Sequence, residues 1–173
     1  YISGHLDSTE LVFLPRHGRG HHQLPSELNY RANIYGLKLL DVTHIISVSA
    51  VGSLQEHLPP EHIVIPDQLI DRTVQRKSTF FGNGVVGHIP FSDPFCPELS
   101  QQLFETAQTC DIPVQAGGTL VTIEGPAFST RAESRLYQSW GIDIIGMTTL
   151  QEAKLAREAQ ICYAVLSMVT DYD

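Results

Sequence analysis

The sequence predicts an α/β fold, with one domain over residues 1–173 in which helices flank a parallel or mixed central β-sheet. Short apolar, β-branched segments alternate with segments of helical periodicity through most of the chain. This alternation is the pattern of strands and helices packed in layers. The chain has 173 residues, of which 42% are hydrophobic and 17% charged. It can therefore bury a sizeable core and lacks the composition of a disordered chain.

Each element follows from a local pattern. Apolar or β-branched runs predict strands at 11–14, 43–49, 62–66, 114–123, 143–146 and 161–169. Apolar residues at helical spacing predict helices at 26–40, 98–110, 130–140 and 149–159. Glycine, proline and small residues predict a cationic loop at 15–22, a turn at 50–53, a long irregular loop within 67–97 and a bulge at 117–118.

Two of the predicted helices begin with the signature of a capping box, in which a threonine is followed three residues later by a glutamate. Thr130 pairs with Glu133 in this way, and Thr149 pairs with Glu152. Each pair can satisfy two backbone amides that the first helical turn leaves free. Gly141 then predicts the end of the first of these helices.

Charge, hydropathy and cysteine content limit the classes of partner and the compartment that we expect for this protein. A net charge of −8 argues against a nucleic-acid partner, which would require a basic surface. No apolar stretch has membrane-spanning length and no signal peptide opens the chain, so we expect a cytoplasmic protein without a membrane partner. Cys96, Cys110 and Cys162 are sparse and odd in number, which predicts free thiols in a reducing compartment rather than disulfides.

The cationic loop carries Arg16 and His17 directly after a predicted strand. Arginine offers a two-pronged donor to a phosphate, and the neighbouring Gly18 allows backbone amides to approach, so an anion site is one interpretation. Composition alone favours a solvated basic loop. The histidines at 17, 21 and 22 lack a nearby acid, so we expect no metal. The loop motifs of ATP and dinucleotide sites are absent from the sequence.

Three further segments allow a functional and a structural interpretation. Ser49 and Ala50 can present a hydroxyl and an amide to an anion, or form an ordinary turn. Phe128 can stack on a planar ring, or pack against the helix that follows it. Thr148 can bind an anion at a helix N-terminus while Thr149 caps the helix, and these two roles are compatible.

Thr170, Asp171 and Asp173 follow the last apolar run. The ends of strands in open α/β sheets are where ligands bind. A buried aspartate there would hold a proton and could pass it to a leaving group. A strand-end acid as the last residue also suggests that the chain is part of a longer protein.

Together these segments resemble the methylthioadenosine phosphorylases, in the trimeric branch of the purine nucleoside phosphorylase family. The matching blocks occur in family order and cover nearly the whole chain: PRHGR (15–19), NYRANIYGLK (29–38), SAVGS (49–53), DQLIDRT (67–73), HIPFSDPFCP (88–97), TLVTIEGPAFSTRAES (119–134), GMTTLQEAKLARE (146–158) and TDYD (170–173). The resemblance implies a phosphorylase-like single domain without its N-terminal phosphate loop and its C-terminal helix.

The resemblance also implies an activity. Phosphate attacks C1′ of 5′-methylthioadenosine, adenine departs and 5-methylthioribose 1-phosphate remains, in purine and methionine salvage. Inorganic phosphate is then a co-substrate, no cofactor is required, and the enzyme is a homotrimer. Adenosine or another purine nucleoside as substrate, a hydrolase, and a purine-binding fragment without catalysis are the alternatives.

The family positions carry over residue by residue. Phosphate binding is implied for Arg16, His17, Ser49, Ala50 and Thr148. Purine binding is implied for Phe128, Thr170, Asp171 and Asp173. Met147 is implied to lie against the ribose, and His88 to reach the 5′ group of the neighbouring subunit's site. Asp171 is implied to protonate the leaving base.

The implied base is adenine. Relatives that act on 6-oxo purines have asparagine in place of Asp171 and glutamate in place of Ser129, and this chain has neither. A carboxylate accepts a hydrogen bond from a 6-amino group but would face the oxygen of a 6-oxo group, which such a site would reject.

Overall fold

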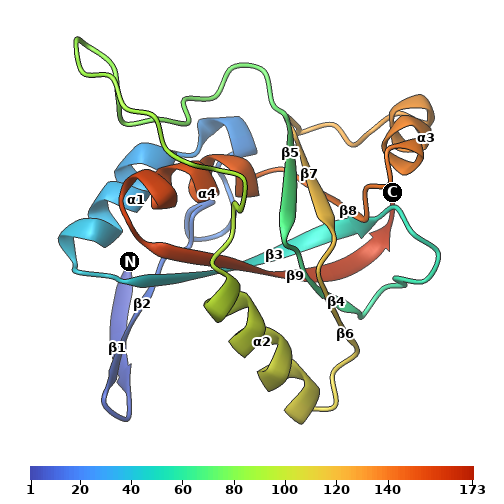
Figure 1. Cartoon of the computed structure of the whole chain (residues 1–173), viewed down its shortest axis with the longest axis horizontal. Helices are drawn as coiled ribbons and strands as arrows, with labels where there is room; N and C mark the ends of the chain where they lie inside the picture. The colour runs from blue at the N-terminus through green and yellow to red at the C-terminus, as the bar shows by residue number, and fades with distance from the viewer.

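The computed structural model describes all 173 residues, and its centre is a seven-stranded mixed β-sheet (Figure 1). Its strands are β3 (His44–Ser53), β4 (Ile63–Ile65), β5 (Gln68–Arg72), β6 (Val114–Ala116), β7 (Thr119–Ile123), β8 (Ile144–Gly146) and β9 (Cys162–Tyr172). They lie in the order β5-β7-β8-β3-β9-β4-β6. Neighbours are parallel except at β8–β3 and β9–β4. The predicted α/β class with a mixed sheet is confirmed.

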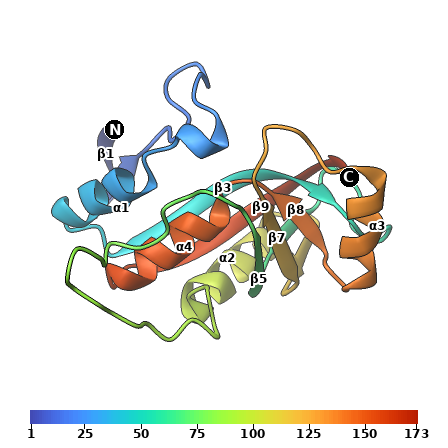
Figure 2. The same ribbon diagram turned by 90° about the horizontal axis from the view of Figure 1, so that it is seen from above.

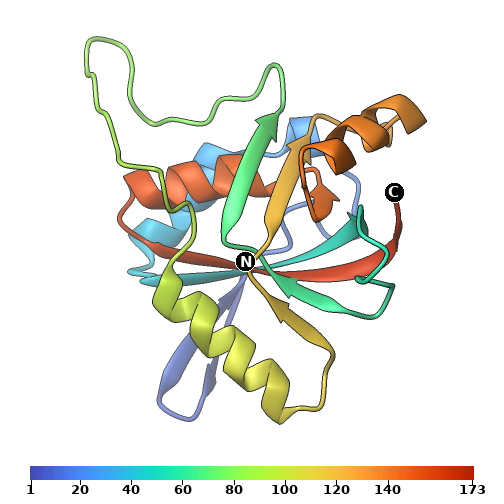
Figure 3. The same ribbon diagram turned by 45° about the vertical axis from the view of Figure 1, so that its right-hand side comes forward.

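Four α-helices cover the sheet: α1 (Tyr30–Leu39), α2 (Pro97–Thr109), α3 (Arg131–Ser139) and α4 (Thr149–Glu158). Helices α4 and α2 lie on opposite sides of the long strands β3 and β9 (Figure 3). Helix α1 packs on the outside of α4 (Figure 2). None of the helices combines the length and the apolar character that crossing a membrane requires.

The largest core cluster joins α1, α4 and β9. Its buried members are Leu28, Tyr30, Ile34, Leu37, Phe95, Ala153, Leu155, Ala156, Ile161, Tyr163 and Val165. Burial of a large apolar side chain stabilises a fold by about 1.5–3 kcal/mol. This cluster therefore fixes α4 on β9, and with it the first turn of α4, which borders the site described below.

The two capping-box predictions have different outcomes. The Thr130 box is confirmed: the Thr130 hydroxyl accepts from the Glu133 amide, and the Glu133 carboxylate accepts from the Thr130 amide at 2.7 Å. Gly141 ends that helix with a φ of 74°. The Thr149 box is wrong, because Thr148 is the N-cap and Glu152 points into the protein interior instead.

Several predicted boundaries are also wrong. Residues 50–53 are not a turn, because β3 continues to Ser53 with an irregularity at Val51 and Gly52. The glycines at 117 and 118 are not a bulge but a break, which sends β6 and β7 to different parts of the sheet. The run at 11–14 is not a buried strand: β2 (Thr9–Phe13) pairs with β1 (Ile2–Leu6) in a separate, largely exposed hairpin.

Other elements differ in extent. The predicted helix 26–40 consists of a short 3₁₀ helix, η1 (Pro25–Glu27), followed by α1. Strand β5 lies inside the segment predicted as an irregular loop. Because this strand is short and has polar ends, its sequence shows no clear alternation of apolar and polar residues. Its hydrogen bonds to β7 make it an edge strand of the sheet.

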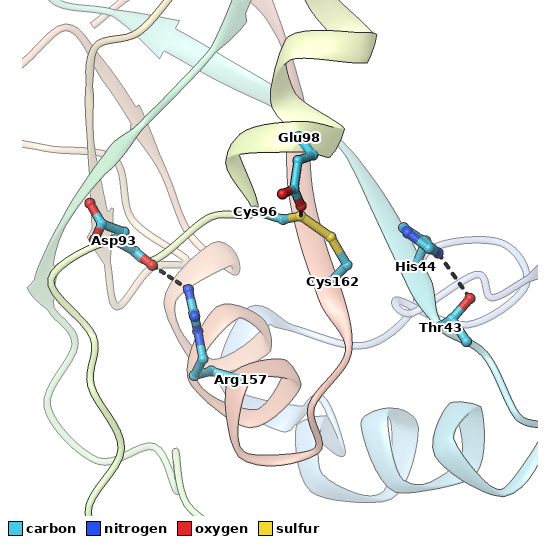
Figure 4. The surroundings of a disulfide bond; sticks show 7 residues. All are labelled: Thr43, His44, Asp93, Cys96, Glu98, Arg157 and Cys162. Carbon is cyan, nitrogen blue, oxygen red and sulfur yellow. Dashed lines mark hydrogen bonds between the residues drawn. A yellow bond between two sulfur atoms is a disulfide. The ribbon is translucent and has the colours of Figure 1, made fainter.

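The prediction of free thiols is wrong for two of the three cysteines. Cys96 and Cys162 form a disulfide, with Cα atoms 5.4 Å apart, and Cys110 is free and exposed. The bond joins the start of α2 to the start of β9 (Figure 4). The backbone amide of Cys96 donates to the Tyr163 carbonyl at 2.9 Å, which holds the two segments side by side. The 66-residue separation gave no sequence signal for this contact.

Candidate active site

A cavity of about 550 Å³ opens where β8 meets β3, the junction at which parallel pairing changes to antiparallel. Ligands in open α/β sheets commonly bind in a crevice outside the carboxyl ends of the strands. The cavity is lined by the following sequence-predicted site residues: Arg16, His17, Ser49, Ala50, Phe128, Met147, Thr148, Thr170, Asp171 and Asp173. The cationic loop and the acidic strand end therefore share one cavity, although more than 150 residues separate them.

Arg16 reaches from the loop after β2 into this cavity. Its Nη1 donates to Ser47 Oγ at 3.1 Å, and its Nη2 donates to Ser49 Oγ at 2.7 Å and Thr148 Oγ1 at 3.1 Å. Its Nε lies 3.4 Å from Glu152 Oε1. We call these five residues the Arg16 network. Because Ser49 and Thr148 accept from Arg16, their own hydroxyl protons are free to bond an anion in the cavity.

Ser47 and Glu152 are the members of this network that the sequence did not reveal, and Glu152 carries its negative charge. Its side chain is 11% exposed, and its Oε2 accepts from Ser47 Oγ at 3.1 Å and Tyr163 Oη at 2.8 Å. Burial, and then the charge of Glu152, raise the pKa of Tyr163 well above its usual range, so the phenol stays a donor. A buried carboxylate needs such partners. Its spacing from Thr149 imitates a capping box, which concealed its role.

His17 is fixed beside Arg16 by its backbone and its neighbours. Its Nδ1 bonds the Gln23 carbonyl at 3.0 Å and so carries the ring proton, which leaves Nε2 as the other polar atom. Its ring stacks on His21 with centroids 4.2 Å apart. Burial lowers the pKa of His17, despite the bond to Gln23. Gly18 has a φ of 78°, and a Cβ there would lie 2.0 Å from the His22 ring, so only glycine fits this bend.

The acidic end of the cavity is formed by Asp171 and Asp173. Thr170 Oγ1 donates to Asp171 Oδ2 at 2.9 Å, and Ser134 Oγ donates to Asp173 Oδ2 at 2.5 Å. Gly52 permits this arrangement, since a Cβ there would lie 3.2 Å from Asp171 Oδ1. Asp171 is exposed, so the prediction of a buried acid is wrong. Its side chain lines the cavity, near the end of the ladder between β9 and β3.

Phe128 and Met147 also line the cavity, and Met147 packs on Gly125, which does not line it itself. Gly125 has a φ of 65°, and a Cβ there would lie 2.5 Å from Met147 Sδ, so the thioether packs directly on the glycine backbone. Phe128 is 80% exposed and lines the cavity. It does not serve as a buried staple on α3, which leaves its ring available for contact with a planar ligand.

His88 is the predicted site residue that the structure does not bring to this cavity. It is exposed and lies in the segment between β5 and α2. This segment passes over α4 on the far side from the acidic end (Figure 1). The contact implied for His88 was with a neighbouring subunit, so its position within one chain does not test that role.

The family model of the phosphorylase superfamily matches residues 1–173. The chain belongs to the phosphorylase superfamily. The resemblance drawn from the sequence motifs is thereby confirmed, and the mixed sheet and its cavity are the phosphorylase fold. Individual relatives of the chain are similar to it both in sequence and in structure.

The S-methyl-5′-thioadenosine phosphorylase of Geobacter sulfurreducens is 63% identical over 174 residues, which cover 100% of this chain and 61% of that relative. The S-methyl-5′-thioadenosine phosphorylase of Koribacter versatilis is 58% identical, with 100% and 59% covered. This superfamily member thus spans about three fifths of the length of these curated relatives.

Solved structures agree. A crystal structure of a methylthioadenosine phosphorylase from an antarctic soil metagenomic library has a TM-score of 0.97 and 56% identity, covering 99% of this chain and 61% of that one. A mutant adenosine/methylthioadenosine phosphorylase from Schistosoma mansoni, in complex with methylthioadenosine, has a TM-score of 0.95 and 41% identity, covering 99% and 67%.

Proposed function

We propose that the protein catalyses the phosphorolysis of 5′-methylthioadenosine. The observation that carries this proposal is the single cavity that joins the Arg16 network to Asp171 and Asp173. The names of the Geobacter and Koribacter relatives, and the methylthioadenosine complex of the Schistosoma relative, support the same reaction. The protein is then a pentosyltransferase of purine and methionine salvage.

Phosphate lies at the Arg16 network in this proposal. Arg16 supplies the positive charge, and the free protons of Ser49 and Thr148 donate to phosphate oxygens, with the Ala50 backbone beside them. His17 contributes Nε2, which accepts a hydrogen bond from the hydroxyl of monohydrogen phosphate when the ring is neutral. Anions held by several charge-assisted hydrogen bonds are bound strongly and in one orientation.

The reaction then proceeds along the cavity from phosphate to base. A phosphate oxygen forms a bond to C1′ while the bond from C1′ to purine N9 breaks, and the bonding pair goes to the purine. Asp171 passes a proton to N7 and takes a replacement proton from solvent. The products are adenine and 5-methylthioribose 1-phosphate. Fixing both reactants in line lowers the entropic part of the barrier.

The remaining residues orient the nucleoside. Phe128 stacks on the purine, Met147 packs against the ribose, and Thr170 lies beside the base. Asp173 accepts from the 6-amino group, held by its bond from Ser134. The Asp173 carboxylate favours a 6-amino over a 6-oxo purine, since a 6-oxo group would leave an acceptor facing an acceptor.

The same proposal includes an assembly and a location. We propose a homotrimer in which His88 reaches the 5′ group in the neighbouring subunit's site, which agrees with its exposed position away from its own cavity. We propose a cytoplasmic location, no cofactor and no nucleic-acid or membrane partner. Sedimentation of the protein at its natural length tests the trimer.

The reaction is tested by mixing the protein at its natural length with methylthioadenosine, adenosine or inosine, with and without phosphate, and following base release. We expect adenine release from methylthioadenosine only when phosphate is present, and little release from inosine. Equal release without phosphate would indicate a hydrolase. Nucleoside binding without any base release would indicate a purine-binding protein without catalysis.

A further inference from the structure

Arg76 is a buried arginine that has no place in the proposed reaction. It lies just after β5, its side chain is 2% exposed, and it does not line the cavity. A buried guanidinium is costly unless each of its donors finds a partner. The partners of Arg76 are therefore informative about what it holds in place.

Its two terminal nitrogens bridge two neighbouring strand ends. Nη1 donates to the Met147 carbonyl, one residue past the end of β8, and Nη2 donates to the Glu124 carbonyl, one residue past the end of β7. Strands β7 and β8 are parallel neighbours, and their ladder stops at Thr122 and Gly146. The planar guanidinium thus joins the two backbone segments just beyond the point where the hydrogen bonds between β7 and β8 end.

Further contacts hold the guanidinium itself. Nε lies 3.3 Å from Glu124 Oε1, and Nη1 also donates to Tyr30 Oη and Gln151 Oε1, each at 3.2 Å. Gln151 is in turn fixed by donating to Thr73 Oγ1 at 2.9 Å. These partners come from α1, α4 and the segment after β5. Arg76 therefore cannot shift without disturbing several elements.

Glu124 extends the same cluster. Its carboxylate accepts from Ser26 Oγ at 2.5 Å and from the Val74 amide at 2.7 Å. Burial alone would raise the pKa of Glu124, but these hydrogen bonds and the charge of Arg76 together lower it. The carboxylate is therefore charged at neutral pH, which keeps the ion pair with Arg76 intact.

Of the two carbonyls that Arg76 bridges, one belongs to Met147, which lines the cavity, and the other to Glu124, which opens the loop to the cavity-lining Phe128. Met147 contributes the thioether, and Glu124 precedes Gly125, on which that thioether packs. A change in the separation of these backbones would open or close the contact between Met147 Sδ and Gly125. The loop that carries Phe128 begins at the same point.

We propose that Arg76 is a positioning residue that sets the separation of Met147 and the Gly125–Phe128 loop, and so determines how well the cavity wall holds the nucleoside. This inference rests on the proposed function and adds a specificity role for a residue outside the cavity. The Arg16 network is anchored mainly through Ser47, Ser49 and Glu152, and only Thr148 adjoins the Met147 carbonyl, so phosphate binding depends less on Arg76 than nucleoside binding does.

The test uses Arg76→Met and Arg76→Lys in the protein at its natural length, with Arg72→Met as the control. Arg72 is an exposed arginine at the end of β5 that packs over Trp140, outside the cavity. We measure the KM for methylthioadenosine, the KM for phosphate, kcat and the midpoint of thermal unfolding. A purely structural residue would affect stability and both substrates alike.

For Arg76→Met we expect the nucleoside KM to rise at least about tenfold, with the phosphate KM within about twofold, because small displacements of a positioned wall have large effects. Arg76→Lys keeps the charge but lacks the planar fork that reaches the two carbonyls with separate nitrogens. It should raise the nucleoside KM more than the phosphate KM, by a smaller factor than Arg76→Met. Arg72→Met should change neither KM. If Arg76→Met does not fold, the comparison of the nucleoside KM with the phosphate KM in Arg76→Lys tests the proposal.

Two outcomes overturn the inference. Equal changes in both KM values, or lower stability with both KM values unchanged, would make Arg76 structural only. Absence of phosphorolysis in the unmodified protein would instead overturn the proposed function, and this inference with it. The unmodified protein is measured first, so the two failures are distinguishable.

Discussion

The two ends of the cavity are built in different ways. At one end the Arg16 network is a closed set of hydrogen bonds between β3, α4 and the loop after β2, with the Arg16 side chain 17% exposed. At the other end Asp171 is exposed, and Phe128 on its loop is 80% exposed. A small, highly charged ligand can be bound by a preformed polar network, whereas a flat apolar base is bound by accessible surfaces.

This contrast separates stability from function. Residues of the Arg16 network should contribute to both, because each is a partner of the others in a region of low exposure. Substitutions of Asp171 and Phe128 should reduce activity with little effect on stability, because few contacts within the protein depend on these side chains.

Asp171→Asn should have the largest effect. We expect kcat for methylthioadenosine to fall by about 10²–10⁴-fold, the contribution of a positioned general acid, because asparagine cannot give a proton to N7. The unfolding midpoint should hardly change, since Asp171 is exposed. The measurements are steady-state kinetics and thermal unfolding. The control Asp41→Asn, at an exposed aspartate after α1, should keep full activity. An active Asp171→Asn variant would remove the proton-donor role.

Arg16→Ala should affect both properties. We expect the phosphate KM to rise by about 10–100-fold, and the free energy of unfolding to fall by about 1–3 kcal/mol, because Glu152 and the hydroxyls lose their charged partner. Phosphate titration of the rate and urea unfolding measure these quantities.

The matched control for Arg16 is Arg19→Ala, an exposed arginine in the same loop that does not line the cavity. It should change neither the phosphate KM nor the stability. A nucleoside KM that rises as much as the phosphate KM in Arg16→Ala would contradict the separation of the two ends.

Phe128→Ala should have a moderate effect confined to function. Loss of stacking should raise the nucleoside KM by about 2–12-fold, the equivalent of about 0.5–1.5 kcal/mol. Stability should change by less than about 0.5 kcal/mol, because the ring is exposed. Phe13→Ala, at an exposed phenylalanine on β2, is the control for a general loss of aromatic surface. A large loss of stability in Phe128→Ala would show that the ring packs on α3 after all.

The smallest expected effect is a pH dependence of stability at His17. Burial lowers the pKa of His17 in the folded protein. The unfolded chain therefore binds this proton more readily, and stability is lost as the pH falls below about 6.5. Urea unfolding between about pH 7 and pH 5 should show a shallower loss in His17→Gln than in the unmodified protein. His5→Gln, on the exposed hairpin, should match the unmodified protein.

Most of the candidate site could be predicted from the sequence, because its residues belong to sequence motifs that occur in the same order as in the family. Arg16, Thr148 and Asp171 were all identified before any contact between them was known. Glu152 and Arg76 were missed, for different reasons. Glu152 stands at the spacing of a capping box, and Arg76 stands in a segment without periodicity. Neither position carries a local signal that its side chain is buried.

The wrong predictions about the fold have a related cause. A glycine pair permits both a bulge and a sharper break in the strand, and only the pairing of β6 with β4 and of β7 with β8 selects the break. The cysteines at 96 and 162 carry no mark of pairing until α2 and β9 are packed together. Local propensity is set by neighbouring residues, whereas these outcomes are set by residues far away in the chain.

The sequence by itself determined the α/β class, the capped helix α3, the glycine bend beside His17 and the identity of the cavity residues, because each depends on backbone preference, periodicity or a local motif. Tertiary structure alone decided that Asp171 is exposed, that Cys96 pairs with Cys162, and that Arg76 bridges β7 and β8. Burial and long-range hydrogen bonding depend on which segments become neighbours, and that depends on the packing of the whole sheet.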